Sequence, residues 1–74
     1  MREKILNILR ELNPYEDIDE DSKLIEDGII DSLTLVLLIS EMESEFHVKI
    51  PEDKLRPEFF GNIPQIENLI KSLI

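Results

Sequence analysis

Chemically reactive side chains are scarce in this sequence. It contains no cysteine and a single histidine, His47, among 74 residues. Without cysteine the fold can form no disulfide and no thiolate metal site, and one histidine argues against a zinc site or a serine–histidine dyad. We therefore expect no metal site and no catalytic residue, and a fold that depends on the packing of apolar side chains.

Basic residues are also few. Eight lysines and arginines face 17 aspartates and glutamates, which gives a formal net charge of −9. This charge opposes binding to nucleic acid or to an anionic membrane surface and favours basic partners. There is no apolar run long enough to cross a bilayer and no signal-peptide pattern after Met1, so we expect a cytoplasmic protein without membrane insertion that starts natively at Met1.

Apolar residues make up 42% of the chain and recur with helical spacing, which excludes a disordered acidic chain. The length allows one small domain, spanning residues 1–74. The pattern predicts an all-α bundle with three main helices, one short helix and a long first loop. We expect the first two main helices to run antiparallel.

The predicted elements are bounded by local signals. Their expected limits are Arg2–Leu12, Asp31 or Ser32 to about His47, a short piece near Arg56–Phe60, and a last helix opening at Asn62.

Prolines, glycine and short polar residues set these limits. The first helix must end before Pro14, and Gly28 can supply a positive φ before the second helix. Asp31 is a good N-cap, while Asn62 and Gln65 have the spacing of a capping box. We expect the long loop to be anchored to the core by Ile18, Leu24 and Ile25. The apolar stripe of the last helix is expected to contain Ile66, Leu69, Ile70, Leu73 and Ile74.

The second helix has apolar residues on two faces. The wider stripe, which we assign to the core, contains Leu35, Leu38, Ile39, Met42 and Phe46. Leu33 and Leu37 point the other way and Val36 lies between, so these three are either scattered surface residues, a docking patch, or a surface buried beneath the long loop. Glu41, with the neighbouring acids of the helix, forms a solvated face or contacts basic partner residues.

Ser32 lies where the glycine-broken loop becomes this helix, so its hydroxyl could cap the helix, act as a nucleophile or accept a modification. His47 is about four helical turns away and cannot activate it, and the Asp31 carboxylate is a poor base for an alcohol. Capping and modification therefore both stay open. An anionic group on Ser32 would be well tolerated at the positive end of a helix.

Three stretches of the sequence resemble the acyl carrier protein family. EDGIIDSL, residues 26–33, looks like the family's attachment motif, and residues 38–51, LISEMESEFHVKIP, resemble its second helix and exit. Residues 62–70, NIPQIENLI, resemble the entry to its last helix. The similarity covers nearly the whole chain in the family's order.

The resemblance implies a single four-helix carrier domain, free-standing and monomeric. It implies that Ser32, with Asp31 as motif residue and cap, carries 4′-phosphopantetheine transferred from coenzyme A by a magnesium-dependent phosphopantetheinyl transferase. The thiol of that arm would hold a carboxylic acid as a thioester. Partner enzymes would recognise the second helix, which points to Leu33, Val36, Leu37 and Glu41 as partner-binding residues.

One departure from the family bears on the cargo. Carriers of fatty acid synthesis often have acidic residues soon after the Ser-Leu pair, whereas this chain has Thr34 and Leu37 there. Two kinds of carrier fit better than one served by the acyltransferases or synthases of ordinary fatty acid synthesis. One is a carrier loaded by an adenylate-forming ligase, such as a D-alanyl or other aminoacyl carrier, and the other is a carrier in a specialised pathway. The alternative is a helical interaction domain that binds through Leu33, Val36 and Leu37 without modification.

Overall fold

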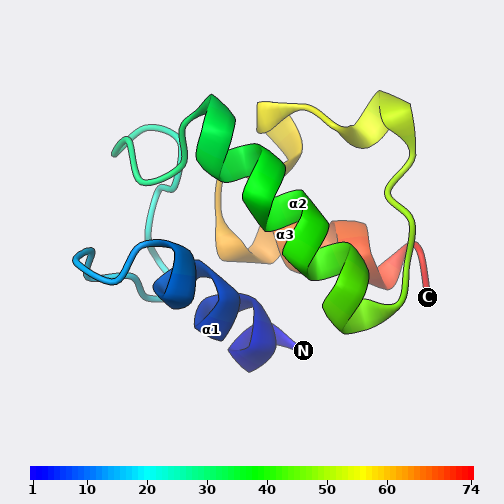
Figure 1. The fold of residues 1–74 in the computed structure, drawn as a ribbon, viewed down its shortest axis with the longest axis horizontal. Coiled ribbons are helices and arrows are strands. Elements are labelled where there is room, and N and C mark those ends of the chain that lie inside the picture. Colours follow the sequence, from blue (N-terminus) through cyan, green and yellow to red (C-terminus); the bar gives the residue numbers. More distant parts are fainter.

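Three α-helices and two short 3₁₀ turns form the regular structure in a computed structural model that describes residues 1–74 (Figure 1). The elements are α1 (Arg2–Leu12), α2 (Ser32–Phe46), η1 (Glu52–Lys54), η2 (Pro57–Phe59) and α3 (Ile63–Lys71). There is no β-strand, and α1 and α2 run in roughly opposite directions. The predicted all-α architecture is confirmed, with its short helix reduced to the single 3₁₀ turn η2.

The apolar stripe of α1 faces both other helices, and α1 contacts α2 and α3. Its buried residues, Ile5, Leu6, Ile8 and Leu9, recur at helical spacing. The helix ends at Leu12 because Pro14 restricts Asn13, whose side chain Nδ2 donates to the Leu9 carbonyl at 3.1 Å. The predicted limits of α1 are therefore confirmed.

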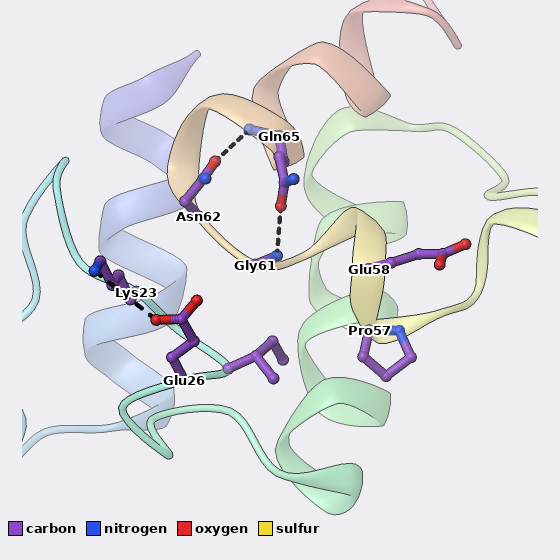
Figure 2. A pocket seen from close by; sticks show the side chains of 8 residues that line it. Lys23, Glu26, Pro57, Glu58, Gly61, Asn62 and Gln65 are labelled. Carbon is purple, nitrogen blue, oxygen red and sulfur yellow. Dashed lines mark hydrogen bonds and ion pairs between the residues drawn. The ribbon is translucent and has the colours of Figure 1, made fainter.

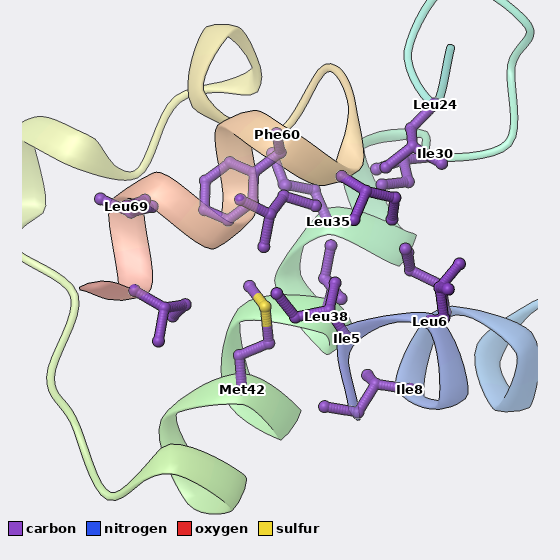
Figure 3. Packing of buried hydrophobic residues seen from close by; sticks show 14 of the residues in the cluster. Ile5, Leu6, Ile8, Leu24, Ile30, Leu35, Leu38, Met42, Phe60 and Leu69 are labelled. Atoms are coloured by element: carbon purple, nitrogen blue, oxygen red, sulfur yellow. The ribbon is translucent and has the colours of Figure 1, made fainter. Parts of the chain in front are cut away.

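The core is entirely apolar. It holds 17 buried residues, none of them polar or charged. Figure 3 shows side chains of Ile5 and Leu6 from α1, Leu38 and Met42 from α2, and Phe60 converging on one region. Burial of each such side chain contributes roughly 1.5–3 kcal/mol, so this packing is the main stabilising contribution in a chain without disulfides.

The long loop between α1 and α2 is anchored by side chains and backbone. Ile18 and Leu24 are buried as predicted, and Ile25 is half-buried. The Leu24 N–H donates to the Gly61 carbonyl and the Ile30 N–H to the Leu24 carbonyl, both at 2.9 Å. The loop is thus tied to the segment that leads into α3.

A guanidinium also holds this loop. Arg10, in the last turn of α1, donates two hydrogen bonds to the Ile18 carbonyl, at 3.0 and 3.2 Å. Gly28 has φ +72°, the left-handed conformation that the sequence predicted for this position.

The C-terminal third differs from the prediction in three details. The turn η1 was not predicted, and α3 ends at Lys71, so Ile74 is 70% exposed and does not belong to the apolar stripe. Asn62 caps α3 by accepting from the Gln65 N–H at 2.8 Å. The Gln65 side chain, however, accepts from the Gly61 N–H at 3.0 Å, one residue before the amide that a capping box would use.

An ion pair joins α1 to α3. Arg2 makes two hydrogen bonds to the Glu67 carboxylate, at 3.0 and 3.3 Å, and Lys71 lies 3.6 Å from the same carboxylate. The hydrogen bonds from Arg2 lower the pKa of Glu67, whose side chain is only 14% exposed.

Candidate functional site at the start of α2

Ser32 is the first residue of α2 and is exposed. Its position follows from the residues before it, because Ile29 and Ile30 are buried and fix the end of the loop against the core. Asp31 then has the extended backbone of an N-cap, with φ −103° and ψ −173°. The chain therefore leaves the core at Ile30 and presents the next side chains to solvent.

The helix cap is Asp31. Its Oδ1 accepts a hydrogen bond from the Thr34 N–H at 2.8 Å, and this bond lowers the pKa of the Asp31 carboxyl. The Ser32 hydroxyl makes no hydrogen bond within the protein. Capping, one of the two roles left open for Ser32 by the sequence, is thus performed by its neighbour.

No group in the chain is placed to activate the Ser32 hydroxyl. His47 caps the opposite end of α2 with φ 54°, so it lies 15 positions after Ser32 along the helix. At a rise of 1.5 Å per residue this separation is roughly 22 Å. The Asp31 carboxylate is already bonded to Thr34 and has a lowered pKa, which makes it a weaker base still.

A shallow hollow of about 380 Å³ adjoins Ser32. Its lining consists of Ile25, Ile30, Asp31, Ser32, Leu35 and Pro57. Together with the positive end of α2, where the Ser32 N–H has no acceptor in the chain, this surface suits an anionic group that continues into an apolar segment. Sequence reasoning missed Ile30 and Pro57 here, because only the fold brings η2 beside the start of α2.

The exposed face of α2 is apolar next to Ser32. Leu33, Val36 and Leu37 are 70%, 62% and 47% exposed. This excludes their burial beneath the long loop. No charged side chain occurs on α2 between Ser32 and Ser40, so this exposed face of the helix is uncharged, and the nearest charge to the hydroxyl is the Asp31 carboxylate of the cap.

The acids further along α2 do not all lie free. Glu41 is exposed and unpaired, whereas Glu43 is half-buried and accepts from the Ile50 N–H at 2.9 Å. Glu45 lies 3.8 Å from Lys4 of α1. The expectation that Glu43 belongs to a solvated or partner-binding face is therefore wrong, because it holds the segment that leaves α2.

The core face of α2 is narrower than predicted. Leu35, Leu38 and Met42 are buried, but Ile39 and Phe46 are only half-buried at its margins. The helix thus has a narrow buried stripe and a broad exposed one, and Ser32 begins the latter.

Comparison with known proteins agrees with this geometry. A family model described as "Phosphopantetheine attachment site" matches residues 3–73. The D-alanyl carrier protein of Streptococcus suis is 43% identical over 68 residues, which cover 89% of this chain and 85% of the relative. That of Enterococcus faecalis is 29% identical over 75 residues, covering 99% and 96%.

An acyl carrier protein of Sulfurovum is 40% identical over 48 residues, or 64% of each chain. No solved structure matches. None of the helices combines the length and the apolarity that crossing a membrane requires.

Proteins of the matched family are carriers rather than enzymes, and they hold 4′-phosphopantetheine covalently. The exposed hydroxyl without a catalytic base, the helical fold and the match over nearly the whole length lead to one conclusion: this chain belongs to the acyl carrier family of phosphopantetheine-binding proteins.

Proposed function

We propose that this protein is a free-standing carrier domain, residues 1–74, modified by 4′-phosphopantetheine at Ser32. The observation that carries the proposal is the exposed Ser32 hydroxyl, which is free of internal hydrogen bonds because Asp31 caps the helix. The arm supplies the thiol that this cysteine-free chain lacks and holds a carboxylic acid as a thioester for delivery to partner enzymes.

The chemistry of attachment must come from a partner. Ser32 has no base within reach, so a phosphopantetheinyl transferase has to remove the hydroxyl proton while it transfers the group from coenzyme A. The chain contributes an accessible oxygen and the positive end of α2, where a phosphodiester is favourable. This division of labour agrees with a carrier that performs no reaction of its own.

The proposed cargo is an amino acid, with D-alanine as the first candidate. Several relatives that match most of the chain are D-alanyl carrier proteins. The uncharged side chains of Thr34 and Leu37 beside the site support the same choice over a fatty acid. An adenylate-forming ligase would load such a cargo, whereas an acyltransferase or synthase would load a fatty or polyketide chain.

We place partner docking on the exposed face of α2, at Leu33, Val36 and Leu37. This patch lies directly beside Ser32, so an enzyme that covers it also reaches the attached arm. Glu41 lies further along the helix and is the one carboxylate of α2 with neither a hydrogen-bond donor nor an ion-pair partner, which suits a single basic residue of the partner.

Intact mass measures the modification directly. Co-expression with a promiscuous phosphopantetheinyl transferase should add the mass of one phosphopantetheinyl group, and Ser32→Ala should abolish the gain. The matched control is Ser40→Ala, which removes an exposed serine of the same helix and should still gain the full mass at Ser32. No gain in the wild type, or a gain that survives Ser32→Ala, would refute the proposal.

The unmodified interaction domain is the alternative supported by the apolar patch. It predicts that Ser32→Ala leaves both partner capture and biological activity intact, whereas a carrier loses activity with the arm.

Loading tests the cargo. The modified protein is incubated with ATP, an adenylate-forming D-alanine ligase and D-alanine, and in parallel with a malonyl transferase and malonyl-coenzyme A. We expect a hydroxylamine-sensitive mass gain with D-alanine alone. A mass gain only from the malonyl donor would reassign the carrier to fatty acid or polyketide synthesis.

A cytoplasmic location is likewise part of the proposal, and cell fractionation tests it.

A further inference from the structure

The serine at the start of α2 follows a compact turn of the long loop, residues Lys23–Ile30. Three backbone hydrogen bonds of 2.9, 2.9 and 3.1 Å close this turn, and the longest in sequence runs from the Ile30 N–H to the Leu24 carbonyl. Ser32 comes two residues after Ile30. The position of the turn therefore decides where the hydroxyl of Ser32 lies.

A single hydrogen bond ties this turn to the C-terminal third of the chain. The Leu24 N–H donates to the Gly61 carbonyl at 2.9 Å, and no other hydrogen bond joins residues 23–30 to the segment after α2. Leu24 and Ile30 are also buried, but apolar contacts are non-directional and leave the turn free to shift over the core. The bond to Gly61 is thus the directional restraint on the turn.

Gly61 is in turn held by the first turn of α3. Gln65 Oε1 accepts from the Gly61 N–H at 3.0 Å, and the Gln65 N–H donates to Asn62 Oδ1 at 2.8 Å (Figure 2). A glycine has no Cβ to restrict its backbone, so the bond from its N–H to the glutamine limits a residue that would otherwise be free to rotate. Gln65 therefore controls the residue that accepts the hydrogen bond from the turn.

The glycine and the glutamine also fit each other sterically. A Cβ on residue 61 would lie 2.7 Å from Gln65 Oε1, and apart from the chain neighbours no other residue would be within 4 Å of it. Gly61 does not have a positive φ, so an alanine there is compatible with the backbone. The side chain of an alanine at this position would thus displace only Gln65.

We propose that Gln65 is a positioning residue for the attachment reaction. Through Gly61 and Leu24 it holds the Lys23–Ile30 turn, and the turn holds Ser32 where a phosphopantetheinyl transferase can reach it. The inference rests on the proposed attachment at Ser32. When the turn shifts, a smaller fraction of the chains can bind the transferase productively, which raises KM and leaves kcat unchanged because the bound complex is the same.

Transfer kinetics test this role. The unmodified protein is incubated with coenzyme A and a promiscuous phosphopantetheinyl transferase, and intact mass follows the product. Gln65→Ala should raise KM by roughly twofold to tenfold, the change in population that one net hydrogen bond supports. Gln65→Glu keeps an oxygen for the Gly61 N–H, and an acid in the first turn of a helix is well tolerated, so it should restore the wild-type KM. An unchanged KM in Gln65→Ala, or an equal rise in both variants, would overturn the inference.

A double-mutant cycle approaches the same bond from its other side. Gly61→Ala displaces the Gln65 side chain and should raise KM about as much as Gln65→Ala does. Because each change breaks the same bond, the double variant should behave like either single one. Effects that multiply in the double variant would show that the two residues act independently, against the proposal.

Two control variants on α3 separate positioning from general stability. Asn68→Ala removes an exposed side-chain amide that makes no hydrogen bond, and Glu67→Gln weakens the ion pair with Arg2 without touching the turn. Both should keep the wild-type KM. A rise in Glu67→Gln as large as that in Gln65→Ala would mean that KM follows stability alone, and the positioning role would be refuted.

Hydrogen exchange of the Leu24 amide gives a readout that needs no transferase. Exchange should be roughly twofold to tenfold faster in Gln65→Ala than in the wild type and unchanged in Asn68→Ala. Equal exchange in all three proteins would overturn the inference. If the wild type gains no phosphopantetheine at Ser32, the proposed function fails; if it is modified there but Gln65→Ala has the wild-type KM, only the positioning role fails.

Discussion

Leu37 and Leu38 are consecutive leucines on α2 with opposite environments, and truncating each to alanine tests the assignment of the two faces. Leu38 is fully buried, whereas Leu37 is 47% exposed. Leu38→Ala should cost about 2–5 kcal/mol of unfolding free energy, because a buried side chain is lost and a cavity remains. Leu37→Ala loses only a partly buried side chain and should cost less than about 1 kcal/mol.

The size of the chain makes this difference easy to measure. A domain of 74 residues has a stability on the order of 4–11 kcal/mol, so Leu38→Ala removes a large fraction of it. The two changes are chemically identical and have equal effects on helix propensity. Urea denaturation followed by circular dichroism gives both free energies, provided that the m-values agree with the wild type. Equal costs for the two variants, or a cost below about 1 kcal/mol for Leu38→Ala, would refute the two-face assignment.

The remaining predictions concern docking, pH and the helix cap. Leu37→Glu should stay folded but raise the KM of the loading ligase for the modified carrier, and unfolding of this variant would contradict the exposed position of Leu37. Glu41→Gln should change mainly the salt dependence of that KM. The pKa of Glu67 is lowered in the fold, so its ion pair with Arg2 stabilises the protein at neutral pH, and this contribution should fade as the pH falls from the ordinary value of 4.5 through the lowered one. Urea midpoints measured against pH should fall more steeply in the wild type than in Glu67→Gln, and parallel curves would refute the linkage. Asp31→Ala should lower the urea midpoint more than Asp31→Asn, which keeps an oxygen for the Thr34 N–H; equal losses would mean that the cap contributes little.

Local signals were sufficient to predict the helices. The limits of α1 follow from its apolar spacing and from Pro14, and the starts of α2 and α3 follow from Asp31 and Asn62 as caps. Helical geometry also assigned Leu33 and Leu37 to the face opposite the core stripe, but their exposure beside Ser32 was settled only by the path of the long loop. Each of the features that were predicted depends on residues within about one turn of one another.

Features that depend on distant segments were missed. Nothing near Ile25 in the sequence shows that Pro57 lies opposite it, so the hollow beside Ser32 could not be predicted. The bond from the Ile50 N–H to Glu43 joins residues seven positions apart across a helix end, and a helical projection places Glu43 simply among exposed acids. Ile29 and Ile30 are buried although the loop around them has no periodicity that would indicate it.

The main-chain bonds that tie Leu24 to Gly61 and Ile30 to Leu24 have an evolutionary consequence. Since backbone groups rather than side chains make them, substitutions at the exposed positions of the long loop would leave these bonds intact, whereas the buried Ile18, Leu24, Ile29 and Ile30 must stay apolar. Related carriers could therefore diverge at the exposed positions of this loop and still present the serine at the same place on the bundle surface. A single transferase could then recognise many such sequences by shape.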